Sequence, residues 1–155
     1  MSALANSNGR TIVVLHGDQT GEELLQEALR VLAPQVIGLD LNFQHFDLSL
    51  ENRRATKNEV VKEAAAAMNK SGLGVKAATI TPPEQNDVGS PNAILREEIN
   101  GTVILRTGRR IPRVRPVGGV HSPISIVRMA VDDAYGAKEW REKTDDGDEI
   151  AYREK

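Results

Sequence analysis

The chain has 155 residues, which suits a single domain of ordinary size. Its 39% hydrophobic and 27% charged residues are ordinary for a globular protein, and the net charge of -2 gives no case for a protein that binds nucleic acid or a membrane surface. Aromatic residues make up only 3%, so the core must come from Val, Ile, Leu and Ala, as in parallel strands flanked by helices. The absence of Cys excludes disulfides, thiol catalysis and cysteine metal sites.

Both ends of the chain are polar. Residues 1–10 have no apolar core and no cleavage pattern, so we predict a disordered tail that is not a signal peptide. No run approaches the roughly 20 apolar residues that a transmembrane helix needs. Residues 141–155 are predicted to be a charged, exposed end, which leaves residues 11–140 for the domain. We therefore expect a cytoplasmic protein with no membrane partner.

The first two elements are predicted from an apolar run and from a periodic segment. Residues 11–15 form a short β-branched run that predicts a buried strand, followed by a tight turn at Gly17. Thr20 and Glu23 have the spacing of a capping box, and apolar residues then recur on one helical face until Pro34. The sequence therefore predicts a strand, a turn and a helix that begins near Thr20.

The alternation of strand and helix continues to residue 80. Apolar and polar residues alternate over residues 39–44, which predicts a second strand. A second capping box at Thr56 predicts a helix that runs through four alanines and ends at Gly72, and residues 75–80 are the third predicted strand. This order implies right-handed βαβ units and an α/β fold with a mostly parallel sheet and flanking helices.

The texture changes after Thr81. A loop rich in proline precedes a short predicted helix over residues 92–99. Two more apolar runs follow, residues 102–105 and residues 124–129, and the sequence between them is rich in Arg, Gly and Pro.

Residues 96–115 contain six arginines and two glutamates, a local net charge of +4 in a chain that is acidic overall. One interpretation is a solvated basic face or a set of ion pairs between chains. A second is RNA or DNA binding, but the segment has no aromatic residue on which bases could stack, so we predict no nucleic-acid partner. The third interpretation is a pocket for a small polycarboxylate or a phosphate.

The pocket interpretation starts from the residues before the last predicted helix. Ser90 and Asn92 lie where the loop turns into that helix, and side-chain donors there join free backbone amides and the positive dipole end in binding an anion. Arg96 is four residues after Asn92 and shares its helix face. Arg106 and Arg128 belong to the two later apolar runs. Because arginines hold carboxylates bidentately, arginines from separate elements can orient a di- or tricarboxylate.

The spacing of six polar residues resembles the substrate signature of isocitrate dehydrogenases, within the isocitrate and isopropylmalate dehydrogenase superfamily. These residues are Ser90, Asn92, Arg96, Arg106, Arg128 and Tyr135. Residues 17–23 resemble the superfamily's opening glycine-rich turn, although Gln19, Thr20 and Glu22 stand where it has Gly, Ile and Pro. Residues 76–82 resemble its strand and loop near the substrate and the nicotinamide. The resemblance implies that residues 11–140 are the amino-terminal part of such a fold, with a partial, mostly parallel sheet.

The resemblance also implies a role for each of these residues. Five side chains would hold the carboxylates of isocitrate: Ser90, Asn92, Arg96, Arg106 and Arg128. The serine and the asparagine would bind the γ-carboxylate, and the three arginines would clamp the α- and β-carboxylates. Thr79 and Thr81 would lie near the nicotinamide end of the cofactor. Tyr135 would be the catalytic acid that protonates the enolate carbon after decarboxylation.

The implied reaction is oxidative decarboxylation of isocitrate to 2-oxoglutarate with NAD or NADP and with Mg²⁺ or Mn²⁺. In family members the metal ligands, the catalytic lysine and the adenosine-binding loop lie beyond the part that resembles this chain. We therefore expect that this chain alone binds neither the nucleotide nor the metal tightly and is inactive. It should need a carboxy-terminal half or a second subunit, in a homodimer. The alternative hypothesis is a non-catalytic truncated homologue that binds polycarboxylates or acts as an assembly partner.

Overall fold

The computed structural model describes residues 9–84, 86–130 and 138–154, and the chain divides into two compact units, residues 1–100 and residues 101–155. This boundary was not predicted from the sequence. Most of the tail predicted at residues 1–10 lies outside the described residues. Among the residues that the structure describes, no helix is both long and apolar enough to cross a membrane.

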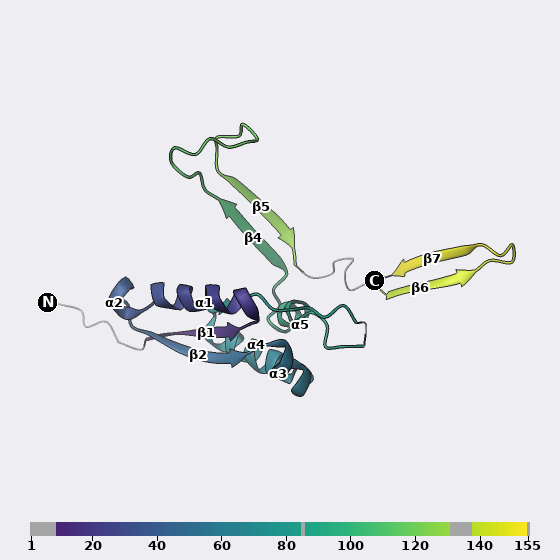
Figure 1. Ribbon diagram of the computed structural model, residues 1–155, viewed down its shortest axis with the longest axis horizontal. Helices are drawn as coiled ribbons and strands as arrows, with labels where there is room; N and C mark the ends of the chain where they lie inside the picture. Colours follow the sequence, from purple (N-terminus) through teal and green to yellow (C-terminus); the bar gives the residue numbers. More distant parts are fainter. Residues whose placement is uncertain (1–8, 85, 131–137, 155) are drawn as a thin grey trace. The chain divides into compact units, whose positions relative to one another are not determined.

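The first unit is built on a parallel sheet of three strands in the order β2-β1-β3 (Figure 1). The strands are β1 (Arg10–His16), β2 (Leu41–Asp47) and β3 (Gly74–Lys76). Arg10 lies opposite Leu41, and Val13 lies opposite Gly74, so the central strand pairs in parallel with both neighbours. The predicted α/β fold with a parallel sheet is confirmed.

Helices cover both faces of this sheet (Figure 1). They are α1 (Gln19–Val31), α2 (Pro34–Ile37), α3 (Leu50–Ala55), α4 (Glu59–Ser71) and α5 (Pro91–Glu98). Val13 and Leu15 point to one face, where they share a core with buried residues of α4 and α5. Val14 points to the other face and packs with Leu25 of α1. Alternate residues of one strand therefore supply two small aliphatic cores, one on each side of the sheet.

The capping boxes predicted at Thr20 and Thr56 are wrong. α1 follows Asp18 and α4 follows Asn58, and neither of these side chains caps its helix. Thr56 ends α3, a short helix that the sequence did not predict, and its hydroxyl donates to the carbonyl four residues earlier at 2.8 Å. Asp18 and Asn58 bind distant backbone groups, so tertiary contacts override the local capping pattern at both starts.

The third predicted strand, residues 75–80, forms only over Gly74–Lys76. Beyond it the chain crosses the turn between β1 and α1, where the amide of Asp18 donates to the carbonyl of Ala78 at 3.0 Å. A Cβ atom at Gly17 would lie 2.0 Å from that carbonyl oxygen, and one at Gly21 would lie 2.6 Å from it. The opening turn is therefore rich in glycine because another segment of backbone passes directly against it.

The second unit consists of two antiparallel hairpins (Figure 1). They pair β4 (Val103–Gly108) with β5 (Ile124–Met129), and β6 (Lys138–Lys143) with β7 (Glu149–Glu154). The first hairpin uses the two predicted apolar runs. The second was not predicted, because residues 141–155 read only as a charged end; in it Trp140 stacks on Tyr152 with ring centroids 5.3 Å apart.

Candidate functional site

The predicted site residues fall on three parts of the chain. Ser90, Asn92 and Arg96 lie at the start of α5 and one turn further on, and Thr79 and Thr81 lie in the loop after β3. Arg106 and Arg128 lie in the first hairpin of the second unit. The predicted catalytic acid, Tyr135, lies outside the described residues.

The start of α5 is fixed by its apolar side. Ser90 is the residue before the helix, and Pro91, which is fully buried, occupies the first helical turn. Leu95 packs into the core beneath the sheet with 7% of its surface exposed. Asn92 and Arg96 are half-buried and stand one turn apart on the same face. The helix therefore presents a hydroxyl, a side-chain amide and free backbone amides at its start, with a guanidinium one turn further along the same face, and this arrangement suits an anion.

Positive charge from three elements gathers near the end of β3. Burial lowers the pKa of Lys76 to about 8, and the nearby guanidinium groups of Arg53 and Arg96 lower it further, while Asp18 opposes them. The amine of Lys76 donates to the hydroxyl of Thr79 at 2.9 Å and to a neighbouring carbonyl at 2.9 Å. An anionic ligand would relieve the repulsion among these cations.

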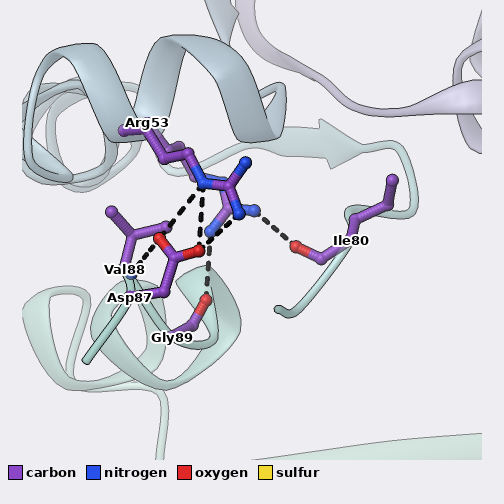
Figure 2. Close-up of polar contacts among 6 residues, drawn as sticks. Arg53, Ile80, Asp87, Val88 and Gly89 are labelled. Carbon is purple, nitrogen blue, oxygen red and sulfur yellow. Dashed lines mark hydrogen bonds and ion pairs between the residues drawn. The ribbon is translucent and has the colours of Figure 1, made fainter. Parts of the chain in front are cut away.

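Arg53 of α3 is fully buried, with 0% of its surface exposed. Its Nε donates to the carbonyl of Leu48 at 3.0 Å, one Nη donates to the carbonyl of Gly89 at 3.1 Å, and the other Nη donates to the carbonyl of Ile80. Figure 2 shows the last two contacts. Burial lowers the pKa of this guanidinium, and the nearby carboxylates of Asp18 and Asp87 oppose that shift.

Asp18 holds the same region from the other side. One carboxylate oxygen accepts from the amide of Leu50 at 2.9 Å, and the other accepts from the amide of Ile80 at 2.8 Å. The backbone of Ile80 is therefore bound at its N–H by Asp18 and at its carbonyl by Arg53. Thr79 and Thr81 flank this doubly bound residue.

The residues before Ser90 are held one after another by α3 and the corner that follows it. Arg54 pairs with Asp87, and its Nη2 lies 2.5 Å from Oδ2 of the carboxylate (Figure 2). The side-chain Nδ2 of Asn58 donates to the carbonyl of Val88 at 2.7 Å. The hydrogen bonds with Arg54 and with the amide of Val88 hold the pKa of Asp87 below its usual range, and the pairing raises that of Arg54. With the contact from Arg53 to Gly89, three consecutive loop residues are anchored.

The register of the first hairpin places Arg106 and Arg128 on one face. Ile104 lies opposite Arg128, and Arg106 lies opposite Ile126, so the two arginines are diagonal neighbours across the strands. Such neighbours have backbones roughly 7–8 Å apart, within the span of a small di- or tricarboxylate. The opposite face is apolar and exposed, and it is formed by Val103, Leu105, Val127 and Met129.

The histidines near the opening turn form a hydrogen-bonded chain with Glu22. His16 binds Glu22 at 2.7 Å through Nδ1 and His45 at 2.8 Å through Nε2, and the amide of Gly17 donates to Glu22 at 3.0 Å. Burial raises the pKa of Glu22, but these hydrogen bonds outweigh it and hold that pKa below its ordinary value. Within the described ranges, no group of three His, Cys, Asp or Glu side chains could hold a metal ion.

Sequence reasoning missed the roles of Arg53, Asp18 and Lys76. Arg53 lies in a polar run between a strand and a helix, where a solvated side chain is the usual outcome. Only the position of Asp18 within the glycine-rich turn drew attention to it. No local sequence pattern predicts that these residues lie close together, because residues 18, 53, 76 and 80 belong to different segments of the chain.

Comparison with known proteins identifies the family of this chain. The isocitrate/isopropylmalate dehydrogenase model matches residues 11–155. Two relatives are mitochondrial NADP isocitrate dehydrogenases: that of Aspergillus niger is 38% identical over 81% of this chain and 26% of its own length, and that of Saccharomyces cerevisiae is 40% identical over 64% and 25%. Isocitrate dehydrogenase [NADP] 1 of Mycobacterium bovis is 33% identical over 78% and 32%.

The matches extend along most of this chain but not along most of its relatives. The chain spans about a quarter to a third of the length of the curated relatives it matches. The parallel βαβ unit, the glycine-rich turn beneath Ala78 and the polar start of α5 all lie within the matched residues. The chain therefore belongs to the isocitrate/isopropylmalate dehydrogenase family.

Proposed function

We propose that this chain supplies the carboxylate-binding part of an NADP-dependent isocitrate dehydrogenase. One observation carries the proposal: the polar start of α5 adjoins a group of cations drawn from three elements, Arg53, Lys76 and Arg96. The relatives named as NADP isocitrate dehydrogenases support the choice of isocitrate among possible polycarboxylates and of NADP over NAD. A tricarboxylate carries the charge and the number of oxygens that such a site can satisfy.

In this proposal each end of isocitrate has its own partners. Ser90 and Asn92 donate to the γ-carboxylate at the start of α5, where backbone amides add to the attraction. Arg96 holds a second carboxylate, and Arg106 and Arg128 reach the substrate from one face of their hairpin. Because a guanidinium group can bind a carboxylate through two parallel hydrogen bonds, these arginines would fix the orientation of the substrate.

The cofactor and the proton donor occupy the other end of the proposed site. Thr79 and Thr81 contact the nicotinamide portion of NADP, which accepts the hydride from the substrate when it is bound. The hydrogen bond from Lys76 fixes the hydroxyl of Thr79 with its own proton free to donate. Tyr135 protonates the carbon left by decarboxylation. Among the described residues, no group of three acidic or histidine side chains could hold Mg²⁺ or Mn²⁺.

The complete activity requires more than the residues described. We propose that a further segment or a second subunit contributes to the finished site, in a homodimer. The exposed apolar face of the first hairpin supports this, because Val103, Leu105, Val127 and Met129 keep 60–69% of their surface exposed. A cytoplasmic location and a lack of activity in the isolated chain remain predictions.

Isothermal titration of the 155-residue chain with isocitrate tests the proposal. We expect binding that weakens as salt is raised, since carboxylate and guanidinium charges attract. Tricarballylate, which lacks the hydroxyl, is the matched ligand for carboxylate recognition alone. NADP-linked turnover by the 155-residue chain alone would contradict the predicted inactivity of the isolated chain. A folded chain that gives no heat at millimolar isocitrate contradicts the proposal.

A further inference from the structure

We propose that Arg53 is a positioning residue that sets the spacing between the two parts of the candidate site in the first unit. The two parts are the Thr79–Thr81 segment after β3 and the Ser90–Asn92 segment that begins α5. The inference rests on the proposed function, because these segments carry the proposed cofactor and substrate contacts. Arg53 itself touches neither ligand.

The first step is the geometry of the guanidinium. Its three nitrogens form a rigid planar fork, and each donates to a carbonyl from a different part of the chain, at residues 48, 80 and 89. Residues 80 and 89 are the two ends of one loop, and the fork holds them at a fixed separation (Figure 2). A flexible amine has no such fork, so lysine could satisfy only part of this set.

The second step is that each loop end is bound by more than Arg53. At the first end, Ile80 is also bound through its amide by Asp18, so its peptide groups cannot rotate freely. At the second end, Asp87 and Val88 are bound by Arg54 and Asn58. Arg53 is the only side chain among the described residues whose hydrogen bonds reach both ends.

The third step is the strain at the corner that carries these side chains. Lys57 and Asn58 both adopt left-handed backbone conformations, with φ of 51° and 65°, although neither is glycine. Such strain persists only where the surroundings determine the conformation, and it gathers at functional sites. In this conformation the side-chain amide of Asn58 donates to the carbonyl of Val88, and its backbone N–H donates to the carbonyl of Arg53 at 2.9 Å. The corner therefore ties Arg53 to the loop that it holds.

The fourth step separates positioning from general stability. An apolar side chain of similar volume can stabilise a core as well as a buried charge does, because burying a charge carries a desolvation cost. A buried charge whose hydrogen bonds all go to backbone carbonyls therefore needs a further explanation. Two of its three acceptors, at residues 80 and 89, lie next to the two segments of the candidate site, and the third, at residue 48, lies between β2 and α3.

Amide hydrogen exchange of the full chain, compared between wild type and Arg53→Lys, tests this inference without any ligand. We expect exchange at Ile80 to accelerate about tenfold or more, together with faster local motion at residues 87–90, while Val14 in β1 is unchanged. Arg30→Gln, which removes an exposed arginine of α1, is the control and leaves both regions as they are. Equal exchange at Ile80 in wild type and Arg53→Lys, or equal acceleration throughout β1, overturns the inference.

Two further measurements secure the result. Asp18→Asn removes the charge of the carboxylate that accepts from the amide of Ile80, but it leaves the hydrogen bond from Arg53 to Gly89. Amide exchange should therefore accelerate at residue 80 and stay unchanged at residues 87–90. Titration with isocitrate should show about tenfold weaker binding for Arg53→Lys at an unchanged Kd for Arg30→Gln. A loosened loop with an unchanged Kd overturns positioning of the site. Failure of the wild type to bind isocitrate overturns the proposed function instead, and the exchange experiment still decides whether Arg53 sets the spacing.

Discussion

The two units of the chain differ in how far they bury the side chains of their strands and helices. In the first unit Leu15 and Val61 keep at most 1% of their surface exposed, and even the charge of Arg53 is fully buried with its donors satisfied. In the second unit Leu105 and Val127 have 65% and 69% of their surface exposed. A sheet with helices on both faces can bury its strands, whereas a two-stranded hairpin has nothing to bury them against.

This difference bears on how the candidate site is built. The start of α5 and the loop after β3 are fixed by contacts inside the first unit, so this part of the site is organised before a ligand arrives. Arg106 and Arg128 share a hairpin face through strand register, but their hairpin carries no helix layer of its own. Preorganisation therefore belongs to the first unit, and four experiments test this difference between the units.

The largest effect should come from the core of the first unit. Leu15→Ala creates a cavity beneath the sheet and should lower the free energy of unfolding by about 2–5 kcal/mol. Its matched partner, Leu105→Ala, removes the same atoms from an exposed hairpin position and should cost less than about 1 kcal/mol. Urea denaturation of both variants measures the difference. Equal losses would mean that the hairpin is packed as tightly as the sheet, which would break the comparison.

The glycines of the two units should differ in the same direction. Gly17→Ala puts a Cβ atom 2.0 Å from a backbone oxygen and should destabilise the chain by about 3 kcal/mol, because the crossing segment has to shift. Gly118→Ala meets no atom within 4 Å and should change stability by less than about 0.5 kcal/mol. Thermal unfolding monitored by circular dichroism reads out both. A silent Gly17→Ala would show that the opening turn is looser than described.

Binding variants test the proposed contribution of each unit to isocitrate binding. Arg96→Ala should weaken isocitrate binding by roughly 1.5–3 kcal/mol, since a charge-assisted contact is lost. Arg106→Ala should give a similar loss if the hairpin reaches the substrate as proposed. Calorimetry compares the two variants, with Arg30→Gln as the control on α1. An unaltered Kd for Arg96→Ala would make that residue an ordinary surface arginine.

The smallest effect is a pH dependence that belongs to Lys76. Its pKa is about 8 in the folded chain against 10.5 ordinarily, so between these values the unfolded chain binds more protons. The free energy of unfolding should therefore rise with pH between about pH 8 and 10.5, by about 1–2 kcal/mol because solvent screens this partly exposed amine, and be level below and above that window. Lys76→Met lacks the titrating amine, so its free energy of unfolding should not show this rise with pH. Parallel curves for the two proteins would contradict the burial of this amine.

The order of the first strands and helices and the family could be predicted from the sequence. β-Branched runs and helical periodicity are local, so they predicted the strands at residues 11–15 and 124–129 and the helix at residues 92–99. The spacing of Ser90, Asn92 and Arg96 likewise predicted that they share one helix face. The sequence did not predict the second hairpin, because its strands are short and rich in charged residues.

Which polar side chains are buried depends on tertiary contacts that the sequence patterns do not reveal. Asp18 and Asn58 sit where local rules predict helix caps or turns, yet they bind backbone groups about 30 residues away or further. Arg53 and Arg54 are adjacent and chemically identical, but one is fully buried against three carbonyls and the other forms an exposed ion pair. The two arginines differ because their side chains lie on different sides of α3. Their partners at residues 80, 87 and 89 belong to a loop that is distant from α3 in the sequence, so local sequence patterns cannot predict these contacts.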